Sequence, residues 1–427
     1  MKIDLRALSR ALIIWGLILT PLFSIGEVSA LLRGSVGSQL LARTPLAIKA
    51  MKDVLLIALV ALGAVRIARS GETNVLAVPF TILFLYTIVV AVLASDSPAL
   101  ALAGLRWSMP VFVAFFVWDV VDGMLMSRIA SVLSVMLGLH VAMQIAELFL
   151  MSHWYGASIL GLAARVPGFF LIPSTAGFFA VTALFFSHFY CENAILRRVT
   201  YFLAPVSVFL TQSGTGIVVL ALVAALLTLG AQRAWLILPI GVAAVAILFP
   251  LLPLLTGRGA DFVAVSGGTR VSIFVDLLRH TQVIPTDFGY VTNTAVSLVA
   301  NGGSGLRTDA IPAIVDSTYA SVWGNLGIGG GLFFALFCVS WGVVVVCSRR
   351  LDLYVATAIF ALYSATTIIF EAYPMNLLLA ISAAYFLREA YVPFWMGRTG
   401  GRSLGKGREA RNGSAPAGLI GELGRLE

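Results

Sequence analysis

Charged side chains are scarce in this sequence. Only 11% of the 427 residues are Asp, Glu, Lys or Arg, whereas 59% are hydrophobic and the mean hydropathy is +0.98. A soluble domain carries about 25% charged residues, so this composition excludes an ordinary soluble globular protein. The apolar runs are long and do not alternate with polar residues, which excludes a membrane β-barrel. We therefore expect helices that span a membrane.

Metal, redox and nucleotide-binding motifs are also missing. The three cysteines, Cys191, Cys338 and Cys347, lie in or beside apolar runs without paired spacing, which indicates small apolar side chains. The four histidines show no metal-binding spacing. No Walker-type or dinucleotide-binding glycine pattern occurs, which argues against an ATP-driven pump. With these motifs missing, we expect no cofactor. The basic residues behind the net charge of +8 are scattered between the apolar runs and in the tail, so we also expect no nucleic-acid partner.

About twelve apolar runs have the length of roughly 20 residues that a membrane-spanning helix needs. Their centres lie near residues 18, 60, 85, 112, 138, 180, 205, 222, 244, 335, 361 and 380. Basic residues gather on one side of these runs, and the positive-inside rule then places both termini in the cytoplasm. The sequence predicts an all-α polytopic protein of the bacterial inner membrane. Its expected parts are helices about one to nine in 1–255, a large outward loop in 256–318, helices about ten to twelve in 319–390, and a disordered basic cytoplasmic tail in 391–427.

The outward loop of 256–318 is much longer than a connection between packed helices requires. Residues 270–279 within it place apolar side chains at helical spacing, and Thr269 precedes them as a candidate N-cap. Gly289 follows a turn that begins at Pro285 and ends the segment. We expect an amphipathic helix that lies against the membrane domain.

Two arginines near the outward face are candidate anion ligands. Arg165 has little polar sequence around it, and an arginine in hydrocarbon costs roughly 2.5–3.5 kcal/mol unless it finds an anion. A phosphate suits its guanidinium group, although contact with lipid headgroups is an equally weighted alternative. Arg270 begins the loop helix, where free backbone N–H groups also attract anions. Arg279 lies on the opposite side of that helix and is more simply a surface charge, and His280 is a weaker candidate ligand.

The end of the loop carries a candidate base. Asp316 is followed by Ser317, Thr318 and Tyr319 and then by a glycine-rich helix. Asp316 is either a general base or a helix N-cap, and the sequence favours neither interpretation. Tyr319 is a candidate substrate contact. Glu371, in the outward turn between the last two apolar runs, is a second possible base or a partner for an arginine.

The order of these features resembles the O-antigen polymerase and ligase superfamily. The resemblance covers about residues 100–390 and rests on the segment from Arg165 to Ser174, the break from Leu210 to Thr215, the arginine-led loop helix, and the run that begins at Asp316. It implies a GT-C-like glycosyltransferase that uses undecaprenyl-diphosphate-linked glycans at the periplasmic face. It also implies inverting, metal-independent transfer, with Arg165 and Arg270 as the two arginines that contact the diphosphate.

Two departures from the family pattern separate the alternatives. O-antigen ligases carry a histidine where this chain has Asp316, which favours a polymerase of exopolysaccharide, capsule or O-antigen over a ligase that transfers the glycan to a lipid A core. Gly214 stands where many members have an arginine, and Arg106 is a candidate replacement for that anion contact. A transporter or flippase of the lipid-linked sugar is a third alternative. The resemblance further implies a flippase and a chain-length regulator as partners.

Overall fold

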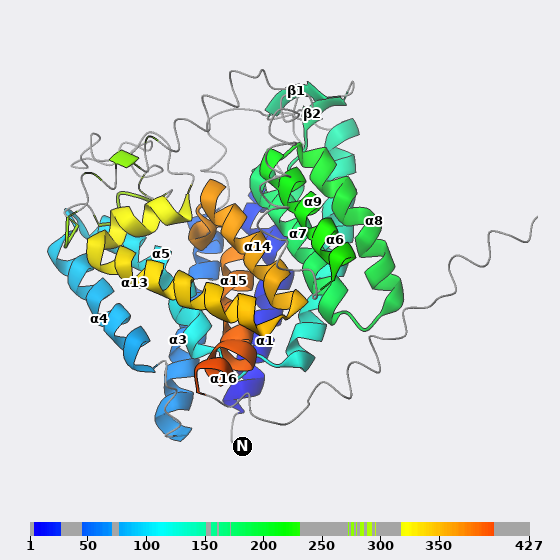
Figure 1. Ribbon diagram of the computed structural model, residues 1–427. Helices are drawn as coiled ribbons and strands as arrows, with labels where there is room; N and C mark the ends of the chain where they lie inside the picture. The colour runs from blue at the N-terminus through cyan, green and yellow to red at the C-terminus, as the bar shows by residue number, and fades with distance from the viewer. Residues whose placement is uncertain are drawn as a thin grey trace, which may run out of the picture.

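The fold is a bundle of helices of very different lengths, seen in a computed structural model (Figure 1). The structure describes residues 4–26, 45–70, 77–150, 155–159, 162–170, 172–230, 272, 275–276, 279, 282–285, 288–292, 295 and 317–396. The helices are α1 (Leu5–Ile18), α3 (Leu46–Ser70), α4 (Ala77–Leu93), α5 (Pro98–Phe116), α6 (Gly123–Leu150), α7 (Pro173–Tyr190), α8 (Ala194–Thr211), α9 (Gly214–Leu229), α13 (Thr318–Ser348), α14 (Leu351–Thr366), α15 (Met375–Phe386) and α16 (Val392–Trp395). Short 3-10 helices η1 (Thr20–Ser24), η3 (Gly168–Phe170) and η5 (Ile369–Glu371), the π-helical turn η6 (Leu387–Tyr391), and an antiparallel hairpin of β1 (Tyr155–Ile159) and β2 (Leu162–Arg165) complete the described elements.

The apolar runs of the sequence are helices. Every expected centre except residue 244, which lies outside the described residues, falls within one of them. The helices long and apolar enough to cross a membrane are Pro98–Phe116, Gly123–Phe149, Ala194–Thr211, Thr318–Ser348 and Met375–Trp395, and α4, α9 and α14 are shorter apolar helices. These helices indicate a multi-pass membrane protein.

The last helix extends a few residues past the expected start of the tail. The tail was expected from residue 391, but η6 and α16 continue the last helix to Trp395. Tyr391 stacks on Trp341, and its hydroxyl lies 2.9 Å from the Ser340 hydroxyl, so side-chain packing holds this turn against α13. The rest of the expected tail lies outside the described residues.

Ion pairs gather at one end of the bundle. The Arg66 guanidinium bonds the Asp119 carboxylate at 2.9 Å, and Arg10 bonds Asp122 near by. The start of α1 and the helix α16 lie at this end, opposite β1 and β2 (Figure 1). It is the end that the positive-inside pattern assigns to the cytoplasm.

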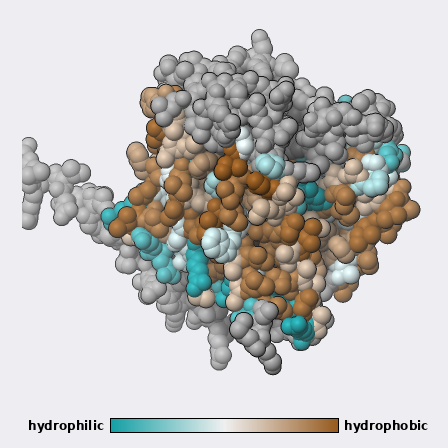
Figure 2. All heavy atoms as spheres, turned by 180° about the vertical axis from the view of Figure 1, so that it is seen from behind, coloured by the Kyte–Doolittle hydropathy of each residue, from teal (hydrophilic) through white to brown (hydrophobic). Residues whose placement is uncertain are grey.

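The outer surface of the helices is apolar. Large side chains that a soluble protein would cover are exposed, among them Phe149 at 77%, Val92 at 75% and Leu336 at 71%. Figure 2 shows such residues across the middle of one face, with hydrophilic residues below them. A surface of this kind is stable against lipid rather than water.

Helices α6, α7 and α8 pack closely together, and α5 packs against α3, α4 and α15. Helix α14 lies between the two groups because it contacts α7 on one side and α15 on the other; it also contacts α9 and α13. The outward ends of α7, α8, α13 and α14 are therefore brought near one another.

Helix α13 is broken at Gly327. This residue has φ 62° and ψ −164°, a conformation available essentially to glycine alone. The break frees two backbone groups, and both find partners: Tyr86 donates its hydroxyl hydrogen to the Leu326 carbonyl at 2.6 Å, and the Ile328 N–H donates to the Gln282 carbonyl at 3.0 Å. Broken backbone inside a membrane domain is tolerated only where such partners exist.

The end of the outward loop is built into the bundle at this break. Phe288 and Tyr290 are fully buried, and the Phe288 ring fills the space beside Gly104 of α5. Asn325 accepts from the Gly289 N–H at 2.9 Å and donates to the Val291 carbonyl at 3.0 Å. Gly289 has φ +90°, a conformation that glycine adopts without strain. This part of the loop is thus a buried component of the membrane domain.

Candidate functional site

The Arg165 segment lies against the break between α8 and α9. The Nε–H of Arg165 donates to the Thr211 carbonyl at 3.2 Å, and the Val166 N–H donates to the Leu210 carbonyl at 3.1 Å. Arg165 is only 8% exposed. The Arg165 segment and the α8–α9 break therefore form one structure, because the carbonyls in the last turn of α8 have no partner within the helix and bond this segment instead.

The break itself places polar groups in the interior. Gln212 has φ 50° and ψ 36°, in the left-handed region that residues other than glycine rarely adopt. Its side chain is buried, and neither amide atom has a hydrogen-bond partner in the described part of the chain. Ser213 caps α9 by accepting from the Gly216 N–H at 3.2 Å, and Gly214 is the first residue of that helix.

The start of α13 joins the same region through the end of α14. The Thr215 hydroxyl donates to the Thr366 hydroxyl at 3.1 Å, and the Thr318 hydroxyl donates to the Thr367 carbonyl at 2.8 Å. Ser317 is the N-cap of α13 and accepts from the Ala320 N–H at 3.4 Å. Asp316, for which a general base and an N-cap were the two alternatives, directly precedes this cap in the sequence. Asp316 itself lies outside the described residues.

The turn that carries Glu371 is anchored beside this helix start. The Ile369 N–H donates to the Thr318 hydroxyl oxygen at 2.9 Å, which ties η5 to α13. Tyr373 donates its hydroxyl hydrogen to the Gly16 carbonyl of α1 at 2.6 Å, and burial raises the pKa of this phenol above its ordinary value. Glu371 is half-buried between these two anchors.

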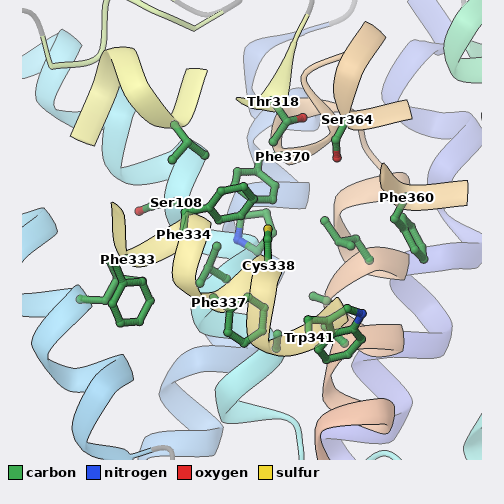
Figure 3. Close-up of a pocket in the computed structure, with 18 of the residues that line it drawn as sticks. Ser108, Thr318, Phe333, Phe334, Phe337, Cys338, Trp341, Phe360, Ser364 and Phe370 are labelled. Atoms are coloured by element: carbon green, nitrogen blue, oxygen red, sulfur yellow. The ribbon is translucent and has the colours of Figure 1, made fainter. Parts of the chain in front are cut away.

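An apolar cavity of about 340 Å³ begins beside this polar region. Thr318 and Ser364 lie at one end of it, and Phe333, Phe334, Phe337 and Trp341 of α13 line its length (Figure 3). Trp107, Phe370 and Tyr319 complete this part of the wall. The cavity offers apolar contacts to a ligand whose polar part lies at the outward ends of α13 and α14.

The remaining predicted site residues are placed as follows. Tyr319 lines the cavity and donates its hydroxyl hydrogen to the Ala361 carbonyl at 3.1 Å. Arg106 bonds the Asp53 carboxylate of α3 at 2.8 Å, so an internal anion compensates its charge. Arg279 is exposed and helical, as a surface charge would be. Arg270 and His280 lie outside the described residues; Ser272, Val275 and Asp276, which belong to the same expected loop helix, are helical.

Several buried polar residues of this region were not recognised in the sequence. They are Gln212 in the α8–α9 break and Glu147, Gln144 and His140 in α6. All three α6 residues are fully buried. The signal available was their spacing, because residues 140, 144 and 147 share one face of a helix.

The described residues thus include the buried guanidinium of Arg165, the Gln212 amide without a described hydrogen-bond partner, and an apolar cavity that begins at the ends of α13 and α14. Such a set of groups suits a ligand with an anionic head and an apolar tail. Among the described residues, no group of three or more His, Cys, Asp and Glu side chains gathers as a metal site would require. Comparison with protein-family models, curated proteins and solved structures gives no match.

Proposed function

We propose that this protein is a polymerase of undecaprenyl-diphosphate-linked oligosaccharide repeat units, for a bacterial exopolysaccharide, capsule or O-antigen. The observation that carries the proposal is the meeting of Arg165 with the α8–α9 break, at the outward end of a bundle that also holds an apolar cavity. An amphiphile with a diphosphate head and a prenyl tail has the two chemical parts that these features would bind.

The proposed reaction is a single displacement at the anomeric carbon of the donor. The acceptor sugar hydroxyl forms the new C–O bond, the bond to the diphosphate breaks, and the electron pair leaves with undecaprenyl diphosphate. Asp316 takes the hydroxyl proton as the proposed base, and Arg165 and Arg270 stabilise the charge that develops on the leaving group. Part of the prenyl tail occupies the cavity along α13.

A reconstituted assay tests the proposal. Purified protein in lipid nanodiscs receives the lipid-linked repeat unit alone, and a ladder of longer lipid-linked products is the expected result. Product that forms only after a lipid A core or another acceptor is added would replace the polymerase with a ligase. Absence of transfer under both conditions would remove the glycosyltransferase proposal.

A pair of arginine variants tests the site. Arg165→Ala should reduce transfer by about 10² or more, because a guanidinium that stabilises leaving-group charge acts mainly in the transition state. Arg198→Ala is the matched control, since Arg198 is exposed near the start of α8, at the other end of that helix. Equal activity of the two variants would contradict the assigned site.

A further inference from the structure

Three polar side chains on one face of α6 surround the segment that follows Arg165. His140, Gln144 and Glu147 are spaced four and three residues apart, so they lie on the same side of the helix. Each is fully buried. The reaction proposed above uses none of them.

Two of these side chains bond the backbone of the segment. Gln144 donates its amide N–H to the Val166 carbonyl at 2.7 Å, and the Glu147 carboxylate accepts from the Gly168 N–H at 2.8 Å. The Ser24 hydroxyl of η1 donates to the Phe169 carbonyl at 2.6 Å. With the Val166 N–H bonded to α8, the backbone between residues 166 and 169 is held by three separate elements. Buried backbone groups require such partners, and here side chains supply them.

His140 fits the same segment by shape. Gly168 has φ +56°, and a Cβ atom built on it would lie 2.6 Å from the His140 ring carbon Cε1. The ring also contacts Phe170, with the ring centroids 4.9 Å apart. The His140 ring therefore occupies the space that a side chain at position 168 would need.

Packing alone does not explain why these buried side chains are polar. The second carboxylate oxygen of Glu147, the amide oxygen of Gln144 and both ring nitrogens of His140 have no hydrogen-bond partner among the described residues. Burial of such groups within a membrane-spanning helix is unfavourable, and buried ionisable residues there usually serve a function. The groups that they hold lie one to three residues after Arg165.

We propose that Glu147 is a positioning residue for Arg165 and acts through its hydrogen bond to Gly168, with Gln144 and His140 completing the support. The inference rests on the function proposed above, in which Arg165 contacts the departing diphosphate. A displacement of about 1 Å at a catalytic group is enough to cost about 10²-fold in rate, so a rigid segment behind Arg165 has a direct kinetic effect.

Substitutions of Glu147 test this in the nanodisc transfer assay. Glu147→Gln keeps an oxygen that accepts from the Gly168 N–H, and it should retain activity within about threefold of the wild type. Glu147→Leu has similar volume and no acceptor, and it should lower kcat by about 10- to 100-fold with a smaller change in KM. Glu192→Leu, at an exposed position beyond the inward end of α7, is the matched control and should leave transfer unchanged.

The double variant Arg165→Ala/Glu147→Leu separates positioning from a general structural role. If Glu147 acts through Arg165, the double variant should be no slower than Arg165→Ala alone. Should Glu147→Leu yield no folded protein, Gln144→Met removes the 2.7 Å bond to the Val166 carbonyl together with a long 3.5 Å bond to the Ser207 carbonyl. It should show the same lack of additivity with Arg165→Ala.

The outcomes distinguish this inference from the function on which it rests. A wild-type protein that neither transfers glycan nor binds undecaprenyl diphosphate overturns both. If the wild type is active, two results overturn the positioning role alone. One is full activity of the Glu147→Leu variant, and the other is a loss of transfer rate in the double variant equal to the product of the two single losses.

Discussion

Substitution of Gly327 by alanine should weaken the contact between the outward loop and α13. The φ of 62° and ψ of −164° at this position impose a strain of about 1–3 kcal/mol on any residue with a side chain. The new methyl group would also lie 2.7 Å from the Gln282 carbonyl oxygen and 2.8 Å from that of Val283. Both oxygens belong to loop backbone, so the loop must move to admit the methyl group.

Gly342 supplies a matched control in the same helix. A Cβ atom there meets nothing within 4 Å, so Gly342→Ala should gain up to about 1 kcal/mol of helix propensity. The two alanine variants should then differ in stability by about 2–4 kcal/mol, with Gly327→Ala the weaker. This difference corresponds to several degrees in apparent unfolding temperature.

Two measurements on nanodisc protein check this reasoning. Thermal unfolding reports the stability difference, and hydrogen exchange reports protection of the backbone amides at 288–292, which should fall in Gly327→Ala and stay unchanged in Gly342→Ala. Equal unfolding temperatures together with full amide protection in Gly327→Ala would refute the idea that this glycine carries the loop contact.

Three further variants have defined outcomes. Gln212→Gly should raise the free energy of unfolding by about 1 kcal/mol, because it removes the strain of a left-handed residue with a side chain. It should lower transfer activity, because it removes a buried amide from the site; higher activity would count against a role for that amide. Arg66→Leu should lower the free energy of unfolding by about 3 kcal/mol, since it removes the hydrogen-bonded guanidinium from Asp119 and leaves only the 3.5 Å ion pair with the exposed Arg6. An unchanged unfolding temperature would contradict this. Asp53→Leu should lower the free energy of unfolding, because it removes the Asp53 carboxylate from Arg106. Adding Arg106→Leu should restore most of that free energy, and a double variant less stable than either single variant would argue against the pair.

Hydropathy located the helices because the membrane imposes a local rule. A helix that crosses hydrocarbon must be apolar over a set length, and that property is visible in a window of about 20 residues. Basic residues between the runs likewise marked the end of the bundle where Arg66 and Arg10 form ion pairs. Arg165 was recognised as a candidate because an arginine without polar neighbours near hydrocarbon requires a partner.

Tertiary contacts decided what each polar residue does. That Arg165 bonds Thr211, that Arg106 bonds Asp53, and that Ser317 caps α13 all depend on neighbours that sequence spacing does not specify.

The sequence by itself determined that this is a membrane protein with many helices, and where most of those helices lie, because apolar length is a property of each segment alone. Only the tertiary structure decided that the end of the outward loop is buried at a helix break, and that α6 supports the Arg165 segment. Those features arise where segments far apart in the chain satisfy one another's hydrogen bonds in a medium without water.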